Sequence, residues 1–214
     1  MERSTKAEKT ALGLNIVIAG LECLAWLVLI PADENTFFYY TNDSNFLALL
    51  CAFLYIADWL HHGKTSRFTE LARYLTTTVL SITFLVVVLV LSPMTGPMGW
   101  YILLFTGTFR VTHLLVPLCS FVSFLFFEDA STLRRQDAGL AFLATFLYAL
   151  VMIILNLFRV TEGPYPFLRV YDQSLLASAV WLAVILGGAY GIGFGLLSCK
   201  RKFGKRRENM EKEK

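Results

Sequence analysis

The stretch that decides the fold is Tyr74–Ser92, which reads YLTTTVLSITFLVVVLVLS and contains no Asp, Glu, Lys, Arg or His. A helix needs about 20 predominantly apolar residues to cross a hydrocarbon core of about 30 Å, and this stretch has that length. We therefore expect Tyr74–Ser92 to form a transmembrane helix.

The rest of the chain has the same character. Its 214 residues are 56% hydrophobic and only 16% charged, whereas a soluble domain is about 45–50% apolar and about 25% charged. Hydropathy predicts six spans: Ala11–Ile30, Phe37–Leu60, Tyr74–Ser92, Trp100–Phe127, Gly139–Phe158 and Ser174–Ser198. The predicted fold is an all-α integral membrane bundle of six helices, with one domain over residues 1–198 and a basic tail over 199–214.

This composition excludes several classes of protein. The net charge of +3 does not indicate a nucleic-acid partner, because the chain has too little soluble surface to form such a domain. The many Leu, Val and Phe residues exclude a disordered chain, and four cysteines without paired spacing imply neither a disulfide scaffold nor zinc. No metal and no cofactor is implied.

Basic residues predict the orientation of the bundle. Sixteen Lys and Arg residues lie in the N-terminal segment, the second and fourth connections and the tail, whereas the other three connections hold only Arg159 and Arg169. The count assigns Arg73 to the second connection and Pro31 and Pro93 to connections. The positive-inside rule then places both termini in the cytoplasm, and we expect a multi-pass protein of the cell membrane. The first span has no small-residue cleavage site and is expected to be retained.

The fourth predicted span carries unusual polar residues. Thr106, Arg110, His113, Pro117 and Ser120 follow one another at spacings of four, three, four and three, which predicts a single helix face turned into the bundle. Burial there favours a neutral imidazole that can accept a proton. The alternative is a structural His113, with Arg110 neutralised by Glu22 of the first span.

A second polar cluster begins the second span. Thr41, Ser44, Asn45 and Ala48 share one face at helical spacing, so two hydroxyls and an amide are expected to point together into the bundle. The alternative is a helix N-terminus at which Thr41, Asn42 or Asp43 caps backbone N–H groups.

Two further features have structural explanations. The turn Glu162–Tyr171, rich in aromatic residues and proline, is typical of a membrane interface. Gly187, Gly191 and Gly195 repeat a small residue every four positions, which favours close helix packing inside the bundle or, as the alternative, a homodimer contact.

Three segments together resemble the androgen-induced protein family, which includes the androgen-dependent TFPI-regulating protein, and in particular its bacterial six-helix branch. They are YTNDSN at Tyr40–Asn45, HLLVP at His113–Pro117 and PYPFL at Pro164–Leu168, and the resemblance extends over essentially the whole chain.

The resemblance implies six helices and, as in the animal members, an intramembrane threonine hydrolase that cleaves fatty acid esters of hydroxy fatty acids. Carried over, Thr41 is the nucleophile and His113 the base, with Asn45, Arg110 and Ser44 as candidate substrate-binding residues and a membrane lipid as substrate. The alternative is a non-enzymatic small transporter or lipid-binding protein. A hydroxyl needs a base within reach to become a nucleophile, yet the predicted spans place Thr41 about two helical turns from the level of His113.

Overall fold

The computed structural model describes residues 5–32 and 36–212, and within these ranges the regular structure is entirely helical. The elements in chain order are α1 (Lys6–Ala32), η1 (Thr36–Phe38), α2 (Tyr40–His62), α3 (Arg67–Val86), η2 (Val87–Leu91), α4 (Ser92–Thr95), α5 (Gly99–Phe105), α6 (Gly107–Phe109), η3 (Arg110–Leu115), α7 (Val116–Val122), η4 (Ser123–Phe127), η5 (Arg135–Ala138), α8 (Gly139–Leu157), η6 (Pro166–Leu168) and α9 (Leu175–Lys212).

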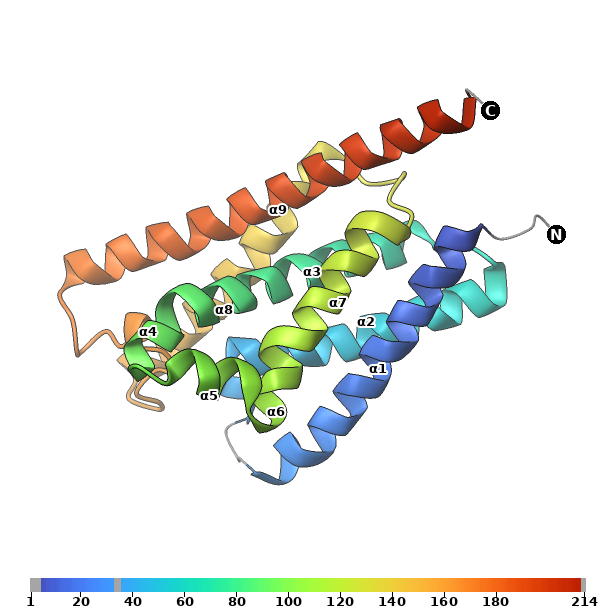
Figure 1. Ribbon diagram of the computed structural model, residues 1–214. Coiled ribbons are helices and arrows are strands. Elements are labelled where there is room, and N and C mark those ends of the chain that lie inside the picture. Colours follow the sequence, from blue (N-terminus) through green and yellow to red (C-terminus); the bar gives the residue numbers. More distant parts are fainter. Residues whose placement is uncertain (1–4, 33–35, 213–214) are drawn as a thin grey trace.

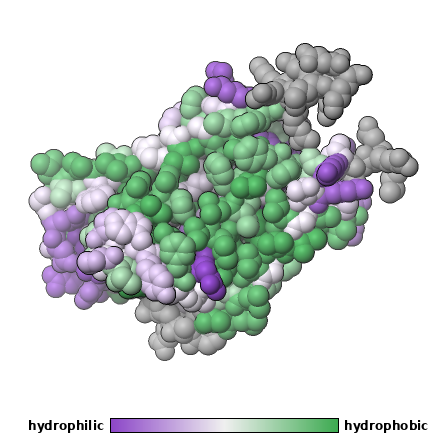
Figure 2. All heavy atoms as spheres, viewed as in Figure 1, coloured by the Kyte–Doolittle hydropathy of each residue, from purple (hydrophilic) through white to green (hydrophobic). Residues whose placement is uncertain are grey.

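Six helices are long and apolar enough to cross a membrane, which confirms the predicted all-α bundle. They comprise Lys6–Val28, Tyr40–His62, Arg67–Thr95, Gly107–Phe127, Arg135–Leu157 and Leu175–Gly204. Figure 1 shows that α1 begins and α9 ends at the same end of the bundle, called here the terminal end. Hydrophobic residues cover most of the middle of the face in Figure 2, while hydrophilic residues gather mainly toward the ends. The chain is therefore a multi-pass membrane protein.

Two prolines and one arginine that were predicted in connections lie inside helices. Pro31 is in the last turn of α1, Pro93 is in α4, and Arg73 is inside α3 instead of in the connection before it. In a regular α-helix the ring of Pro93 would clash with the carbonyl of Leu89, four residues earlier, and the π-helical η2 widens the helix at that point. A helix can thus continue through a proline where its turns widen.

The fourth span is shorter than predicted because the helix is interrupted. Thr106 has extended backbone angles (φ −110°, ψ 145°), and Gly107 has φ +46°, in the left-handed region that glycine tolerates. Trp100–Phe105 therefore belongs to a separate helix, α5, and the span begins at Gly107. Hydropathy cannot detect this interruption, since the residues on both sides of it are equally apolar.

The last helix is longer than the predicted span, and it corrects one expectation about its glycines. α9 continues without interruption from Leu175 to Lys212, through residue 199, at which the predicted tail begins. Two of the basic residues counted for the orientation, Arg3 and Lys214, lie outside the described residues. Gly187 and Gly191 are exposed, and an added Cβ on either would meet no atom within 4 Å, so packing inside the bundle is wrong for them.

The glycine of α9 that packs inside the bundle is Gly193. A Cβ there would lie 2.7 Å from the Tyr74 hydroxyl of α3 and 3.3 Å from the carbonyl of Ala138. Gly195 is half-buried, and an added Cβ on it would also meet no atom within 4 Å. The homodimer through Gly187, Gly191 and Gly195 stays a prediction.

Candidate functional site

The start of α2 presents the face that the sequence predicts. Thr41, Ser44, Asn45 and Ala48 are all buried, which confirms their common inward direction. The N-cap residue is Tyr39, whose side chain makes no capping hydrogen bond, so the capping role expected as an alternative for Thr41, Asn42 or Asp43 is wrong.

Tyrosine hydroxyls cap the free N–H groups of this helix end. The backbone N–H of Tyr40 donates to the hydroxyl of Tyr148 (3.1 Å), and that of Thr41 donates to the hydroxyl of Tyr165 (3.2 Å). The Tyr165 hydroxyl also contacts the Thr41 side chain. Burial raises the pKa of Tyr165 to about 12, so its phenol stays neutral at ordinary pH. A neutral hydroxyl therefore lies beside the proposed nucleophile.

Asn45 connects the segment HLLVP to the same place. Its Nδ2 donates to the carbonyl of Thr41 (2.6 Å) and to that of Thr112 (3.1 Å), the residue before His113. Together with Tyr165, this contact joins the three segments around Thr41. Both N–H groups of the Asn45 amide are occupied, and its Oδ1 has no hydrogen-bond partner.

Ser44 ties α2 to α3. Its Oγ donates to the carbonyl of Thr41 (2.9 Å) and lies 2.9 Å from the hydroxyl of Thr83. The side chain is 3% exposed. Its observed contacts are therefore those of a packing residue.

His113 lies in the π-helical η3, and its ring is held from two sides. Its Nδ1 is 2.9 Å from the carbonyl of Leu103, and its ring stacks on Phe109 with centroids 5.1 Å apart. A carbonyl can only accept a hydrogen bond, so Nδ1 carries the proton and Nε2 is left as an acceptor. The group that orients His113 is thus a backbone carbonyl of α5, which the sequence did not indicate.

Thr41 and His113 lie closer to the same level along the bundle than the predicted spans place them, but no hydrogen bond joins them. Since the fourth span begins at Gly107, His113 lies six residues from its start, near the end at which α2 also begins. No hydrogen bond links Thr41 with His113, both of which are described. Pro117 lacks an N–H for the His113 carbonyl four residues earlier, which favours the wide turn of η3.

Arg110 departs from the predicted inward face. It is exposed and makes no ion pair with Glu22, whereas His113, Pro117 and Ser120 are buried. The interruption before Gly107 and the widened η3 change the helical register, so the ideal spacing fails at Arg110. The ion pair offered as an alternative is absent among the described residues.

Thr41 borders a small cavity of about 40 Å³, which has room for about three water molecules. The lining residues are Tyr40, Thr41, Ile82, Thr83, Val86, Thr145, Tyr148, Ala149, Tyr165, Phe167, Leu168 and Ile185. His113 is not among them. The cavity wall is thus almost wholly apolar, although several residues that carry hydroxyl groups border it, and such a wall suits a hydrocarbon chain.

The aromatic turn is partly buried. Tyr165, Phe167 and Leu168 pack in a cluster with α8 and α9, whereas Tyr171 is exposed, and the position of the turn at the membrane interface stays a prediction. Asn156 holds the turn, since its Nδ2 donates to the carbonyl of Thr161 (2.8 Å) and its Oδ1 accepts from the N–H of Val170 (2.8 Å). The turn therefore serves to place Tyr165 against α2.

A second buried polar cluster was missed by the sequence reasoning. Arg73 of α3 and Glu128, which follows η4, form an ion pair whose side chains are each 1% exposed. Arg73 Nε lies 3.1 Å from both carboxylate oxygens, and its Nη2 lies 2.9 Å from Oε1. Ser123 donates to the same carboxylate at 2.7 Å and Asn15 at 3.2 Å.

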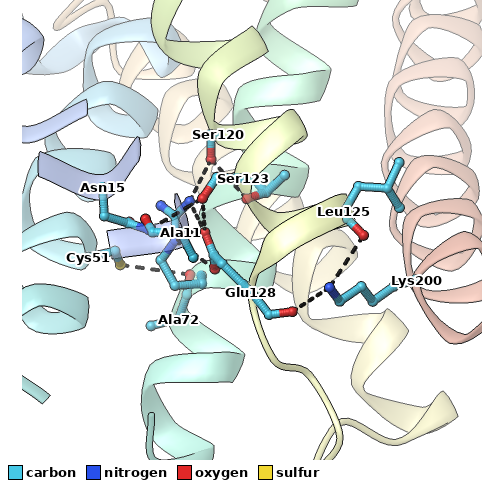
Figure 3. A network of polar contacts seen from close by, with 11 residues as sticks. Ala11, Asn15, Cys51, Ala72, Ser120, Ser123, Leu125, Glu128 and Lys200 are labelled. Carbon is cyan, nitrogen blue, oxygen red and sulfur yellow. Dashed lines mark hydrogen bonds and ion pairs between the residues drawn. The ribbon is translucent and has the colours of Figure 1, made fainter. Parts of the chain in front are cut away.

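Figure 3 shows that the groups around Glu128 come from several helices, with Asn15 on α1, Ser120 on α7 and Lys200 on α9. A signal for this cluster does exist in the sequence. Asn15 is a strongly polar residue inside the first predicted span, and Arg73 continues the face of α3 that carries Thr69, Thr76 and Thr77, all buried.

An apolar layer separates the ionic cluster from the Thr41 site. Ile18, Ala48, Leu80 and Val116 come from four helices, are each 0% exposed and pack in one cluster. Leu80 lies between Arg73 and Thr83 along α3, and Val116 lies between His113 and Ser120 along the fourth span. The bundle therefore has a polar region on either side of an apolar middle layer.

Comparison with known proteins gives no relative. No protein-family model, no curated protein and no solved structure matches this chain. Within the described residues, no group of three or more His, Cys, Asp or Glu side chains is placed to hold a metal ion.

Proposed function

We propose that this protein is an intramembrane lipid ester hydrolase of the cell membrane, with Thr41 as nucleophile and His113 as base. The substrates are fatty acid esters of hydroxy fatty acids or similar long-chain esters. The observation that carries the proposal is the position of Thr41, buried at a helix start, bordering an apolar cavity and in contact with Tyr165. The distribution of basic residues supports cytoplasmic termini.

The reaction proceeds in two balanced steps. The Thr41 oxygen forms a bond to the ester carbonyl carbon while its proton passes to Nε2 of His113, and the ester C–O bond breaks as the alcohol leaves with that proton. Water then attacks the acyl-threonine, His113 takes a proton from the water, and Thr41 regains a proton as the fatty acid leaves. The step requires His113 to reach the hydroxyl directly or through one water.

Neutral hydroxyls are suited to stabilise the oxyanion that forms in each step. Tyr165 can turn its O–H toward the developing charge, because its pKa of about 12 keeps the proton on the phenol. The helix start adds the partial positive charge of its N–H groups. Asn45 is less suited, since both its N–H groups already bond to carbonyls.

Entry of a lipid requires movement. An acyl chain exceeds the volume of about 40 Å³, so side chains around the cavity must separate when substrate enters. Arg110 is exposed, and there it can pair with the carboxylate of a hydroxy fatty acid product or substrate.

A fluorophosphonate probe that reacts with activated hydroxyls tests the proposal on purified protein in lipid nanodiscs. We expect wild type to be labelled and Thr41→Ala to lose the label. Ser81→Ala is the matched control: it removes a half-buried hydroxyl of α3 that does not border the cavity, and it should keep the label. His113→Ala should slow labelling by roughly 10²–10⁴-fold. Labelling that persists in Thr41→Ala refutes the assigned nucleophile.

The alternative from the sequence, a non-enzymatic transporter or lipid-binding protein, gives a different result. It predicts neither labelling nor release of fatty acid from long-chain esters by folded wild type. That outcome would overturn the hydrolase proposal.

A further inference from the structure

Glu22 differs from the other acidic side chains whose surroundings the structure describes. It lies inside the first membrane span, is 0% exposed, and neither carboxylate oxygen has a hydrogen-bond partner. The polar group beside it is the indole N–H of Trp26, one turn further along α1, and neither group makes a hydrogen bond of good geometry.

Glu128 is also buried, but it is paired with Arg73, and its surroundings show what a charged carboxylate needs inside this bundle. Glu128 receives hydrogen bonds from Arg73, Asn15 and Ser123. Burying a carboxylate away from water is far more costly when no cation and no donor compensates the lost hydration. Glu22 has no cation as a partner, and the Trp26 indole N–H beside it makes no hydrogen bond of good geometry, so the neutral form of Glu22 is the stable one in the packed bundle.

The elements that pack against α1 are α2, α6, η3, α7 and η4. They carry few charged or ionisable side chains that could stabilise a charged Glu22. Arg110 of η3 is exposed, His113 of η3 gives its Nδ1 proton to Leu103, and Glu128 after η4 is paired. The buried ionisable groups of α2 are Cys51 and Tyr55, and neither forms a hydrogen bond with Glu22.

A proton fits this site better than a metal ion does. A cation such as Ca²⁺ needs six or more oxygen ligands, and Na⁺ or Mg²⁺ likewise needs several. Within the described residues no cluster of acidic, His or Cys side chains accompanies Glu22. A proton needs only the carboxyl oxygen itself.

We propose that Glu22 is a proton-binding site within the membrane. The carboxyl group keeps its proton at neutral pH while α1 packs on α2 and η3. It releases the proton to water only in an arrangement that lets water reach this face, leaving a carboxylate and a hydronium ion. Ionisation of Glu22 and opening of the α1 face are therefore coupled, and each promotes the other.

Reaction with dicyclohexylcarbodiimide tests the site in wild type. This apolar reagent enters membranes and modifies protonated carboxyl groups. We expect an adduct on Glu22 at neutral pH, located by peptide mass spectrometry, and none on Glu128, whose carboxylate oxygens are held by Arg73 and Ser123. The absence of an adduct on Glu22, or equal adducts on both residues, overturns the proposal.

Infrared spectroscopy gives a direct second measurement. The difference between wild type and Glu22→Gln in bilayers should contain the carbonyl stretching band of a protonated carboxyl. The control Glu162→Gln alters an exposed residue, and its difference spectrum should lack this band. Carboxylate bands in the Glu22→Gln difference spectrum refute the proposal.

Discussion

Removing one partner of the buried Arg73–Glu128 pair should destabilise the bundle more than any other single change of charge. Arg73→Met leaves the Glu128 carboxylate with only Asn15 and Ser123 as donors in an environment where its side chain is 1% exposed. Breaking a buried ion pair in this way costs about 3–5 kcal/mol of unfolding free energy. Glu128→Met should cost a similar amount, since it leaves the guanidinium with Ser120 as its remaining side-chain partner.

The double variant separates the pair from the rest of the network. Replacing both Arg73 and Glu128 by Met removes both charges together, so its cost should not exceed that of either single variant. The cycle then gives a coupling energy of about 3 kcal/mol or more between the two side chains.

The assay is reversible unfolding of the purified protein by sodium dodecyl sulfate in mixed micelles, followed by circular dichroism. Arg67→Met is the matched control. Arg67 pairs with Asp137 at 3.2 Å, but its side chain is 38% exposed, and such a pair contributes about 0–1 kcal/mol. The reasoning is refuted if Arg73→Met costs no more than Arg67→Met, or if the double variant costs the sum of its singles.

Three further outcomes follow from the packing. Gly193→Ala should lower the unfolding free energy by about 1–3 kcal/mol because its Cβ meets the Tyr74 hydroxyl at 2.7 Å, whereas Gly191→Ala, with nothing within 4 Å, should be neutral or slightly stabilising in the same assay. Asn156→Ala should cost about 1–3 kcal/mol and expose the aromatic turn to proteolysis; an unchanged digestion pattern would contradict this. The raised pKa of Tyr165 makes its phenol neutral in the folded state, so unfolding free energy should fall as pH rises from about 10 toward about 12, and Tyr165→Phe should make that fall shallower in a pH series of unfolding curves.

Much of the fold is visible in the sequence because a bilayer imposes a simple rule. Every backbone polar group in the hydrocarbon must be bonded within its own helix, so a long apolar stretch such as Tyr74–Ser92 has one outcome. The inward face of Thr41, Ser44 and Asn45 follows from helical spacing in the same way, and the structure buries all three. These predictions depend only on local sequence.

Predictions failed where a neighbouring helix alters local geometry. Arg110 was placed on the face of His113 by assuming an ideal helix, but the interruption at Gly107 and the wide turn of η3 rotate it to the surface. Arg73 was assigned to a connection because charge usually marks a helix end, yet Glu128, fifty-five residues later, provides the partner that lets it enter the span. Local sequence patterns indicate neither the exposure of Arg110 nor the partner of Arg73.

The sequence by itself therefore determined the number of spans, their approximate positions and the residue types with chemical potential, since apolar length and helical period are local properties. Only the tertiary structure decided which polar groups meet. It brought the Tyr165 hydroxyl to Thr41, the Leu103 carbonyl to His113 and Glu128 to Arg73, and it left Glu22 without a partner. The physical reason is that a buried polar group must find its compensation across helices, and that partner is fixed by packing.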